Sequence, residues 1–455
     1  MKLIEINRSI VPEAAYWCIK DMEKAFWLDS GMDEGRLGRY SFIGAGPTGY
    51  FKIDRSEGVS SDFDKCNIKG LDPFVSLSMW LEGKRLDARH EIPFLGGAVG
   101  YFSYDMKNLI EDLPRTAVED IDLPLCELYH YEWTYIFDHL TERAYVGSYD
   151  DQADLKAVAG LFDDKVGVEV VDGPFIKSEL TSNMSHESYI KAIESVKSYI
   201  KAGDIYQINY TQRFSAQFCS DETSLYYQLR RRNPAPFAAY LKYDGYSVLS
   251  SSPERFVKLI GDQVETRPIK GTVKRGLTLE EDDKNRKWLE NSEKDHAELL
   301  MIVDLERNDL SKIAAKGSVE VPQLFQIETY PTVFHLVSTV TATLSEKKTA
   351  VDVIKAAFPG GSITGAPKIR AMQVIDELEP TARNIYTGSI GYISQNGDMD
   401  LNIVIRTILR HKEHVYYQVG GGIVWDSIPE SEFEETLAKG VALKRTLYHD
   451  SSIKA

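Results

Sequence analysis

The sequence predicts an α+β fold in which antiparallel sheets pack under helices. Three observations support this fold class. Residues 1–175 contain many short alternating aromatic runs, such as 128–136, that are typical of strands. From Ser185 onward helices and strands alternate, but without the regular βαβ rhythm of a doubly wound parallel sheet. The acidic, weakly patterned segment 152–173 is expected to connect an N-terminal region, 1–175, to a second domain, 185–447.

The helices of the second domain are predicted from the spacing of apolar residues and from the residues that begin and end helices. Ser185 can cap a helix whose apolar residues recur at helical spacing from Ile190 to Ile200, and Gly203 stands where that helix would end. Proline at a helix's first turn is favourable, which supports a later helix opening at Pro367. The further helices are expected over 294–314, 367–377 and 430–448.

An alternating strand is predicted over 205–214, and its two faces differ. Gln207, Asn209 and Thr211 share one face with Arg213, while apolar side chains occupy the other. The polar face would either be solvated or line a site, and the pattern alone leaves both open. Other strands are expected over 247–251, 256–260, 386–394, 400–409 and 415–419.

Composition excludes several classes of function. The chain has 455 residues, and its 53 Lys and Arg against 69 Asp and Glu leave a net charge of −16. Such an acidic chain is a poor partner for nucleic acid or an anionic membrane. The longest weakly polar stretch, 93–104, is too short to span a bilayer, and the N-terminus does not resemble a signal peptide. Four dispersed cysteines without a CxxC pair favour a reducing compartment, so a cytoplasmic protein is expected.

Two predicted helices carry carboxylates three residues apart. Asp295 and Glu298 form one pair, and Glu432 and Glu435 form the other, with Lys439 one turn further on. If these helices faced each other, the converging oxygens would suit a hard cation such as Mg²⁺. The alternative is that both pairs are solvated helix faces.

Lys270 stands in a short segment between Pro268 and Gly271. A lysine fixed in this way can be held against a ligand, and its amine becomes nucleophilic if it is partly removed from water. The alternative is a surface lysine in a turn. The run Gly420–Gly422 follows a strand and could bring backbone N–H groups close to an anion, although a tight turn explains it equally well.

Several segments in this order resemble the chorismate-utilising enzymes. They are PIKGT at 268–272, DHAELLMIVDLERNDL at 295–310, FPGGSITGAPKIRAM at 358–372, GSIGY at 388–392, IRT at 405–407, GGGIV at 420–424 and EFEETLAK at 432–439. The resemblance covers 185–447, and the segment GRYSFIG at 38–44 is similar to the family's more variable N-terminal region. It implies the large α+β fold of that family, and it is strongest to the members that form 4-amino-4-deoxychorismate.

The resemblance implies a set of site residues. Mg²⁺ would be bound by Glu298 and Glu435, with Asp295 and Glu432 as outer partners through water. Chorismate would contact Gln207, Gly271, Thr272, His335, Tyr386, Arg406, Gly420, Gly421, Gly422 and Lys439. For His335, a buried structural role is the competing interpretation.

The same resemblance implies the chemistry. Glu254 matches the general acid that protonates the departing C4 hydroxyl, which needs a sheltered carboxyl of raised pKa. Lys270 matches the amine proposed to attack C2 of chorismate before ammonia adds at C4. Relatives that add water have lysine where this chain has Gln207, so ammonia is the expected nucleophile. The product would keep its enolpyruvyl group, and a separate lyase would convert it to para-aminobenzoate for folate.

Two alternatives stay open. The anthranilate-forming members are the first, although they typically have alanine at the position of Lys270. The second is a non-catalytic chorismate-binding regulator, against which the intact set of Glu254, Lys270, Glu298 and Glu435 argues. Leu299 departs from the family pattern, because relatives often have histidine there.

The expected partner is a glutamine amidotransferase subunit. The chain has no amidotransferase signature of its own, so ammonia derived from glutamine would come from a second chain. Ser30, Pro236 and Phe237 lie in segments that resemble the tryptophan pocket of the relatives. They would form a pocket for bound tryptophan, or serve in packing only.

Overall fold

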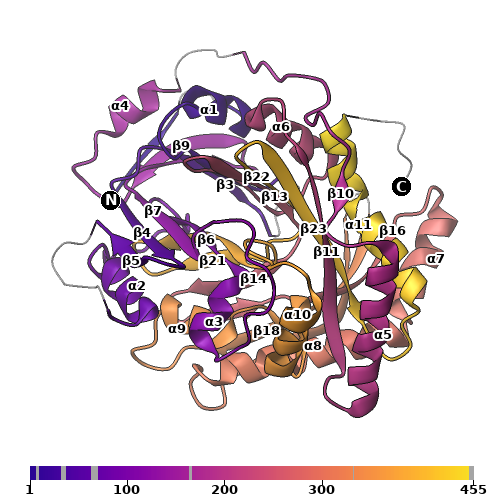
Figure 1. The fold of residues 1–455 in the computed structure, drawn as a ribbon. Helices are drawn as coiled ribbons and strands as arrows, with labels where there is room; N and C mark the ends of the chain where they lie inside the picture. The colour runs from indigo at the N-terminus through magenta and orange to yellow at the C-terminus, as the bar shows by residue number, and fades with distance from the viewer. Residues whose placement is uncertain (7–9, 32–36, 63–69, 163–166, 331–332, 450–455) are drawn as a thin grey trace.

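The structure of the protein is a computed structural model, and it describes residues 1–6, 10–31, 37–62, 70–162, 167–330 and 333–449. Two large sheets form its centre, with helices arranged around them (Figure 1). Every pairing between named strands is antiparallel within this part of the chain. The predicted α+β arrangement of antiparallel sheets under helices is therefore confirmed.

The first sheet has 12 strands. In spatial order they are β1 (Lys2–Glu5), β9 (Arg143–Ser148), β8 (Thr134–Asp138), β3 (Tyr40–Gly44), β2 (Phe26–Asp29), β12 (Phe237–Lys242), β13 (Tyr246–Ser252), β22 (Thr407–His411), β23 (His414–Ile423), β11 (Gln207–Gln217) and β10 (Thr181–Ser182), with β19 (Gly365–Ala366) also paired to β11.

The second sheet has 11 strands. Their order is β16 (Ile269–Lys274), β18 (Val333–Thr343), β15 (Gln263–Thr266), β14 (Arg255–Ile260), β21 (Met399–Asn402), β20 (Ser389–Ser394), β6 (Gly97–Phe102), β7 (Cys126–Tyr131), β4 (Gly49–Asp54) and β5 (Gly58–Ser61), with β17 (Glu320–Thr329) paired to β18. Both sheets contain strands from either side of the predicted boundary, so 1–175 and 185–447 share their sheets. The boundary itself stays a prediction from sequence.

The two sheets pack face to face through aromatic side chains. Phe42 of the first sheet lies 5.7 Å from Tyr392 of the second, measured between ring centroids. The hydroxyl groups of Tyr101 and Tyr246 are 3.0 Å apart across the same interface. The outer faces are covered by helices, so both sheets are shielded on both sides.

The described helices are α1 (Pro12–Ile19), α2 (Pro73–Glu82), α3 (Lys107–Ile110), α4 (Leu155–Gly160), α5 (His186–Ala202), α6 (Glu222–Arg232), α7 (Leu279–Glu290), α8 (Glu293–Ser311), α9 (Ala350–Ala357), α10 (Lys368–Leu378) and α11 (Pro429–Tyr448), with short 3₁₀ turns η1 (Tyr104–Met106) and η2 (Gly361–Ile363). Among them, none is both long enough and apolar enough to cross a membrane.

Local signals set several helix ends as predicted. Ser185 accepts a hydrogen bond from the Ser188 amide at 3.1 Å and caps α5. Gly203 ends that helix with φ at +83°, a conformation that favours glycine. The helices predicted over 294–314, 367–377 and 430–448 are confirmed as α8, α10 and α11, each with slightly different ends.

The single strand predicted over 400–409 is wrong. The chain forms β21 in the second sheet, leaves it after Asn402, and enters the first sheet as β22 at Thr407. Arg406 stands at the corner with φ at +53°. Both strands are buried in their sheets, so apolar residues recur throughout 400–409. The sequence pattern therefore gives no sign that the chain passes from one sheet to the other. The strand predicted over 386–394 begins later, at Ser389.

Candidate active site

Lys270 is held at a bulge in β16. This strand pairs with β18, and its register shifts between Lys270 and Thr272. Gly271 supplies the extra residue with φ at +75°, where a Cβ atom would come within 2.7 Å of Leu289 and 2.9 Å of Asp295. The predicted segment around Lys270 thus contains a β-bulge. The bulge changes the direction of the neighbouring side chains, and its positive φ requires glycine.

The Lys270 amine lies among polar groups without a close carboxylate partner. Its Nζ donates to the carbonyl oxygen of Ser362 at 3.4 Å, and no described Asp or Glu oxygen lies within ion-pair distance of it. Burial lowers the pKa of Lys270, partly opposed by the more distant Glu298 and Glu254. A larger fraction of this amine is therefore neutral, and nucleophilic, than for an ordinary lysine.

Glu254 lies beside the same amine in the turn between β13 and β14. It is only 6% exposed, and its Oε1 has no hydrogen-bond partner within the described residues. Burial raises the pKa of Glu254, while the nearby Ser362 and Lys270 side chains partly oppose that rise. This is the sheltered carboxyl that an acid catalyst requires.

Gln207 and the glycine run of β23 form another wall. Gln207 is 2% exposed and donates through Nε2 to Glu298 Oε2 at 3.4 Å, whereas its Oε1 is without a partner in the described chain. The neighbouring register places Asn209 opposite Gly422. A Cβ atom at Gly422 would strike the Gln207 amide and lie 3.7 Å from Lys270 Nζ. The glycine run therefore lets the backbone approach both side chains, and it is a strand rather than a turn.

The carboxylates of α11 face the same glycine run. A Cβ atom at Gly421 would lie 3.3 Å from Glu432 Oε2 and 3.4 Å from Glu435 Oε1. Lys439 pairs with Glu435 Oε1 at 2.6 Å and donates to the Gly420 carbonyl at 3.0 Å. These contacts join the predicted residues of α11 to those of β23.

The acidic groups of α8 and α11 are oxygen donors of the kind that a hard cation prefers. Burial raises the pKa of Glu298 and of Glu432. At Glu435 the effect of burial is outweighed by the nearby lysines, Lys439 foremost, which lower its pKa. Glu432 Oε2 is buried without a partner in the described residues. Mg²⁺ commonly takes only one or two protein carboxylates and completes its shell with water and substrate. No group of three or more His, Cys, Asp or Glu side chains in the described ranges could hold a metal ion.

Asp295 lies next to this group on the first turn of α8. Its Oδ2 accepts a hydrogen bond from the Ser292 hydroxyl at 2.5 Å, and its carboxyl approaches Gly271. Leu299, the departure from the family pattern, is fully buried in the apolar core under the second sheet. Glu298 therefore lies on a polar face of α8, while the neighbouring Leu299 packs that helix into the apolar core.

A cationic and aromatic wall completes the arrangement. Arg406 donates to the Lys439 carbonyl at 2.7 Å and has no carboxylate within ion-pair distance in the described chain. Burial lowers the pKa of Arg406, partly offset by Tyr386. A half-buried guanidinium without a carboxylate partner suits a bound carboxylate. Thr272 contacts His335 Nδ1 at 2.8 Å, and burial lowers the pKa of His335 to about 4.

The structure places several of the predicted site residues near one another. Gln207 is hydrogen-bonded to Glu298, Lys270 and Glu254 influence each other electrostatically, and Arg406 is joined to Glu435 through Lys439. Sequence reasoning missed Ser362, whose carbonyl oxygen accepts a hydrogen bond from the Lys270 amine. The glycine-rich segment that contains it, 358–368, belongs to the family motifs, but a backbone acceptor carries no side-chain signal that would single it out.

The residues of the predicted tryptophan pocket lie at a separate cavity. Pro236 and Phe237, with Tyr40 and Tyr392, line a space of about 420 Å³. Ser30 lies beside it, and its hydroxyl donates to the Pro236 carbonyl at 3.4 Å. The three residues predicted from separate segments are thus neighbours.

Comparison with known proteins decides the family. The family described as chorismate binding enzyme matches residues 23–445, almost the whole chain. The chain belongs to the chorismate-binding enzymes. Aminodeoxychorismate synthase component 1 of Klebsiella aerogenes is 41% identical over 441 residues, which cover 94% of this chain and 95% of the relative. The protein of the same name from Escherichia coli strain K12 is 42% identical over 417 residues, covering 91% of each chain.

A solved structure supports the same assignment. Anthranilate synthase component I from Streptococcus pneumoniae TIGR4 matches this chorismate-binding enzyme with a TM-score of 0.80 and 31% identity, covering 98% of this chain and 99% of that one. The resemblance seen in the sequence motifs is confirmed, and so is the large α+β fold that it implied.

Proposed function

We propose that this chorismate-binding enzyme is component 1 of an aminodeoxychorismate synthase, which converts chorismate and ammonia to 4-amino-4-deoxychorismate. The observation that carries the proposal is the Lys270 amine, held without a close carboxylate partner beside the buried Glu254 within the described residues. The relatives named aminodeoxychorismate synthase component 1, at 41% and 42% identity over most of the chain, support it.

The reaction divides into two balanced steps. The neutral Lys270 amine forms a bond to C2, both conjugated ring double bonds shift by one position, and the C4–O bond breaks as Glu254 gives its proton to the departing hydroxyl. The leaving group is water, and Glu254 is left ionised. Ammonia then bonds to C4, the electrons shift back, and the bond between C2 and Lys270 breaks. Glu254 takes the proton that the new amine releases, which restores both residues.

The remaining residues bind and orient the substrate. Glu298 and Glu435 would hold Mg²⁺, with Asp295 and Glu432 as partners through water. Bound there, the ion would supply positive charge for the ring carboxylate of chorismate, which explains how an acidic chain can accept an anion. Arg406, with Lys439 and the amides of 420–422, would receive the second carboxylate. His335, Thr272 and Tyr386 would contact the ring region.

Gln207 favours ammonia over water as the nucleophile. An amide cannot take a proton from water at neutral pH, so this position lacks the base that water addition needs. Ammonia would come from a glutamine amidotransferase subunit, and the words "component 1" in the names of the relatives support a partner chain. Such a pair of subunits would work in the cytoplasm.

The cavity at Phe237 is proposed to hold tryptophan. Its volume of about 420 Å³ and its aromatic lining suit an indole ring. Equilibrium dialysis with radiolabelled tryptophan tests this proposal. Binding that Phe237→Ala weakens at least about tenfold would support it. Absence of binding to the wild-type protein would leave the cavity as packing only.

The deciding experiment is a product assay with chorismate, Mg²⁺ and ammonium, with and without an added aminodeoxychorismate lyase. Formation of 4-amino-4-deoxychorismate, converted to para-aminobenzoate when the lyase is present, is the expected result. Anthranilate as the main product would move the assignment to anthranilate synthase component I. Binding of chorismate without turnover would indicate a regulator.

Lys270→Ala is predicted to reduce aminodeoxychorismate formation by about 100-fold or more, because the attacking amine is removed. Lys274→Ala, four residues along the same strand and exposed, is the matched control and should keep wild-type kcat. The measurement is steady-state kcat with saturating ammonium. Unchanged kcat in Lys270→Ala would exclude the covalent step.

A further inference from the structure

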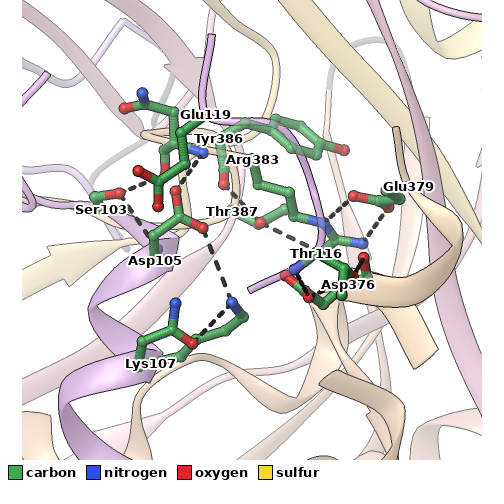
Figure 2. A network of polar contacts seen from close by, with 12 residues as sticks. Ser103, Asp105, Lys107, Thr116, Glu119, Asp376, Glu379, Arg383, Tyr386 and Thr387 are labelled. Atoms are coloured by element: carbon green, nitrogen blue, oxygen red, sulfur yellow. Dashed lines mark hydrogen bonds and ion pairs between the residues drawn. The ribbon is translucent and has the colours of Figure 1, made fainter. Parts of the chain in front are cut away.

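Arg383 is a buried arginine behind the candidate active site. It lies in the segment between α10 and β20, and its residue exposure is only 3%. Its Nε donates to Glu379 Oε2 at 2.9 Å and its Nη2 to Glu379 Oε1 at 2.7 Å, the paired contacts visible in Figure 2. The ring of Tyr104 lies 4.8 Å from the guanidinium carbon.

The other donors of Arg383 reach three separate segments. Nη1 donates to the Ile363 carbonyl at 2.9 Å and to Thr387 Oγ1 at 3.4 Å. Nη2 donates to the Asn209 carbonyl at 2.5 Å. With the two bonds to Glu379, all five N–H bonds of the guanidinium are used.

Each segment carries a residue of the site. Ile363 follows Ser362, whose carbonyl receives the Lys270 amine. Asn209 follows Gln207 by two residues and pairs with Gly422. Thr387 follows Tyr386 directly, and both are labelled beside Arg383 in Figure 2.

Glu379 fixes the guanidinium itself. Its Oε1 also accepts a hydrogen bond from Thr211 Oγ1 at 2.7 Å, and Thr211 in turn accepts one from Gln418 Nε2 at 2.6 Å. These residues lie on β11 and β23, the strands that carry Gln207 and the glycine run. Glu379 is therefore hydrogen-bonded to the sheet that forms one wall of the site.

We propose that Arg383 is a positioning residue that holds the segments of Ser362, Gln207 and Tyr386 in fixed register, so that their contacts meet on one substrate. Arg383 does not itself touch the reacting atoms. It acts through the carbonyl groups of Ile363 and Asn209, which it binds directly. The inference rests on the proposed function for the reaction that these residues serve.

Arginine is required because the three segments need several donors in one plane. A lysine would keep the positive charge opposite Glu379, but its single nitrogen cannot reach Ile363 and Asn209 together with Glu379 in this fork geometry. Arg383→Lys therefore preserves the buried charge pair and removes the joint hold on the segments.

The test compares Arg383→Lys with Arg230→Lys in the ammonium-dependent assay. Arg230 is also a largely buried arginine bound to two carboxylates, Glu13 and Asp29, and these partners lie outside the segments that carry the candidate chorismate-site residues. Arg383→Lys is expected to lower kcat of folded protein by about 30-fold to 100-fold, with the KM for chorismate changed less than about threefold. Arg230→Lys should lose about as much thermal stability as Arg383→Lys, but its kcat should stay within about threefold of the wild type.

A second measurement does not depend on turnover. Acetic anhydride modifies lysine amines, and mass spectrometry can follow the rate at Lys270 at a fixed pH. That rate reports how accessible the Lys270 amine is and how much of it is neutral. Arg383→Lys is expected to change that rate by about threefold or more, and Arg230→Lys is expected to leave it unchanged. Equal kcat and equal labelling in wild type and Arg383→Lys would overturn the inference.

The outcomes separate the inference from the proposed function. An inactive wild-type protein would contradict the proposed function, and the labelling comparison would still decide the role of Arg383. If Arg383→Lys does not fold, Glu379→Gln keeps the arginine and the side-chain size while it removes the anchoring charge. Wild-type kcat and labelling in that folded variant would overturn the inference, and a loss of both would support it.

Discussion

Glu306 shows how strongly burial can change a single residue. It lies on α8, is 8% exposed, and accepts a hydrogen bond from Thr266 Oγ1 at 2.7 Å. Burial raises the pKa of Glu306 to about 8, and the nearby carboxyl groups of Glu254 and Asp309 add to the rise while Lys368 opposes it. At neutral pH this carboxyl therefore carries a proton, which a free glutamate would have lost.

Glu306→Gln should alter the pH dependence of stability. Between about pH 4.5 and pH 8 the folded chain keeps the Glu306 proton and the unfolded chain releases it, so the wild-type unfolding free energy falls as pH rises. Glutamine mimics the protonated form. The variant should match the wild type near pH 5 and exceed it by roughly 2–4 kcal/mol at pH 8, measured by urea unfolding.

Glu194→Gln is the control for this prediction, because Glu194 is exposed in the middle of α5. Its difference from the wild type should stay near zero at every pH. A Glu306→Gln difference that does not grow with pH would contradict the raised pKa.

At the scale of an element, the bulge in β16 decides where Lys270 lies. In a regular strand Lys270 and Thr272 would lie on the same face, and their partners on β18 would also be two residues apart. The register shift at Gly271 re-aims them, so that Thr272 meets His335 while Lys270 reaches Ser362. The irregularity is thus the local structure on which the proposed nucleophile depends.

Gly271→Ala should damage both stability and catalysis. The new Cβ would meet Leu289 at 2.7 Å and Asp295 at 2.9 Å, and φ at +75° is unfavourable for alanine. We expect a loss of about 2–3 kcal/mol in unfolding free energy and at least a roughly tenfold fall in kcat. Thermal unfolding and the ammonium-dependent assay are the measurements.

Gly245→Ala is the matched control for that change. Gly245 has φ at +79° with nothing within 4 Å of the added Cβ among the described residues, so alanine there brings the backbone cost without the clash. It should lose about 1 kcal/mol and keep wild-type kcat. If both variants behave alike, the close approach at Gly271 has no catalytic role.

At the scale of the whole molecule, the two regions of the chain build common sheets. In the first sheet β2 pairs with β12, and in the second sheet β6 pairs with β20. Each pair joins a strand before residue 175 to one after residue 185. Removing the first region would leave β12 and β20 as bare edges beside an uncovered aromatic core.

A fragment of residues 185–455 is therefore predicted not to fold alone, although it contains every candidate chorismate-site residue. Circular dichroism and tryptophan fluorescence should show an unfolded or aggregated chain, whereas co-expression with 1–184 should restore soluble protein. A cooperative thermal transition in the isolated fragment, with wild-type activity, would contradict this prediction.

Much of the candidate site could be predicted from the sequence because its chemistry is carried by short motifs. The i, i+3 carboxylates of α8 and α11 and the lysine before Gly271 are all visible as patterns. Ser362 and Arg383 were missed because one acts through a backbone carbonyl and the other through contacts to distant segments. Neither kind of contact has a local signature in the sequence.

The sequence by itself determined the helices α5, α8, α10 and α11, several strands of the later region and the set of reactive side chains, because periodicity, capping residues and motif spacing are local properties. Only the tertiary structure decided that 400–409 divides between two sheets, that Gly271 forms a bulge, and that the carboxylates of α8 and α11 lie beside the strands that carry Gln207 and the glycine run. These features depend on long-range strand pairing and on burial, which sets the protonation of groups such as Glu254 and Lys270. A sequence records which groups are present, but their separation and their access to water arise only when the sheets close around them.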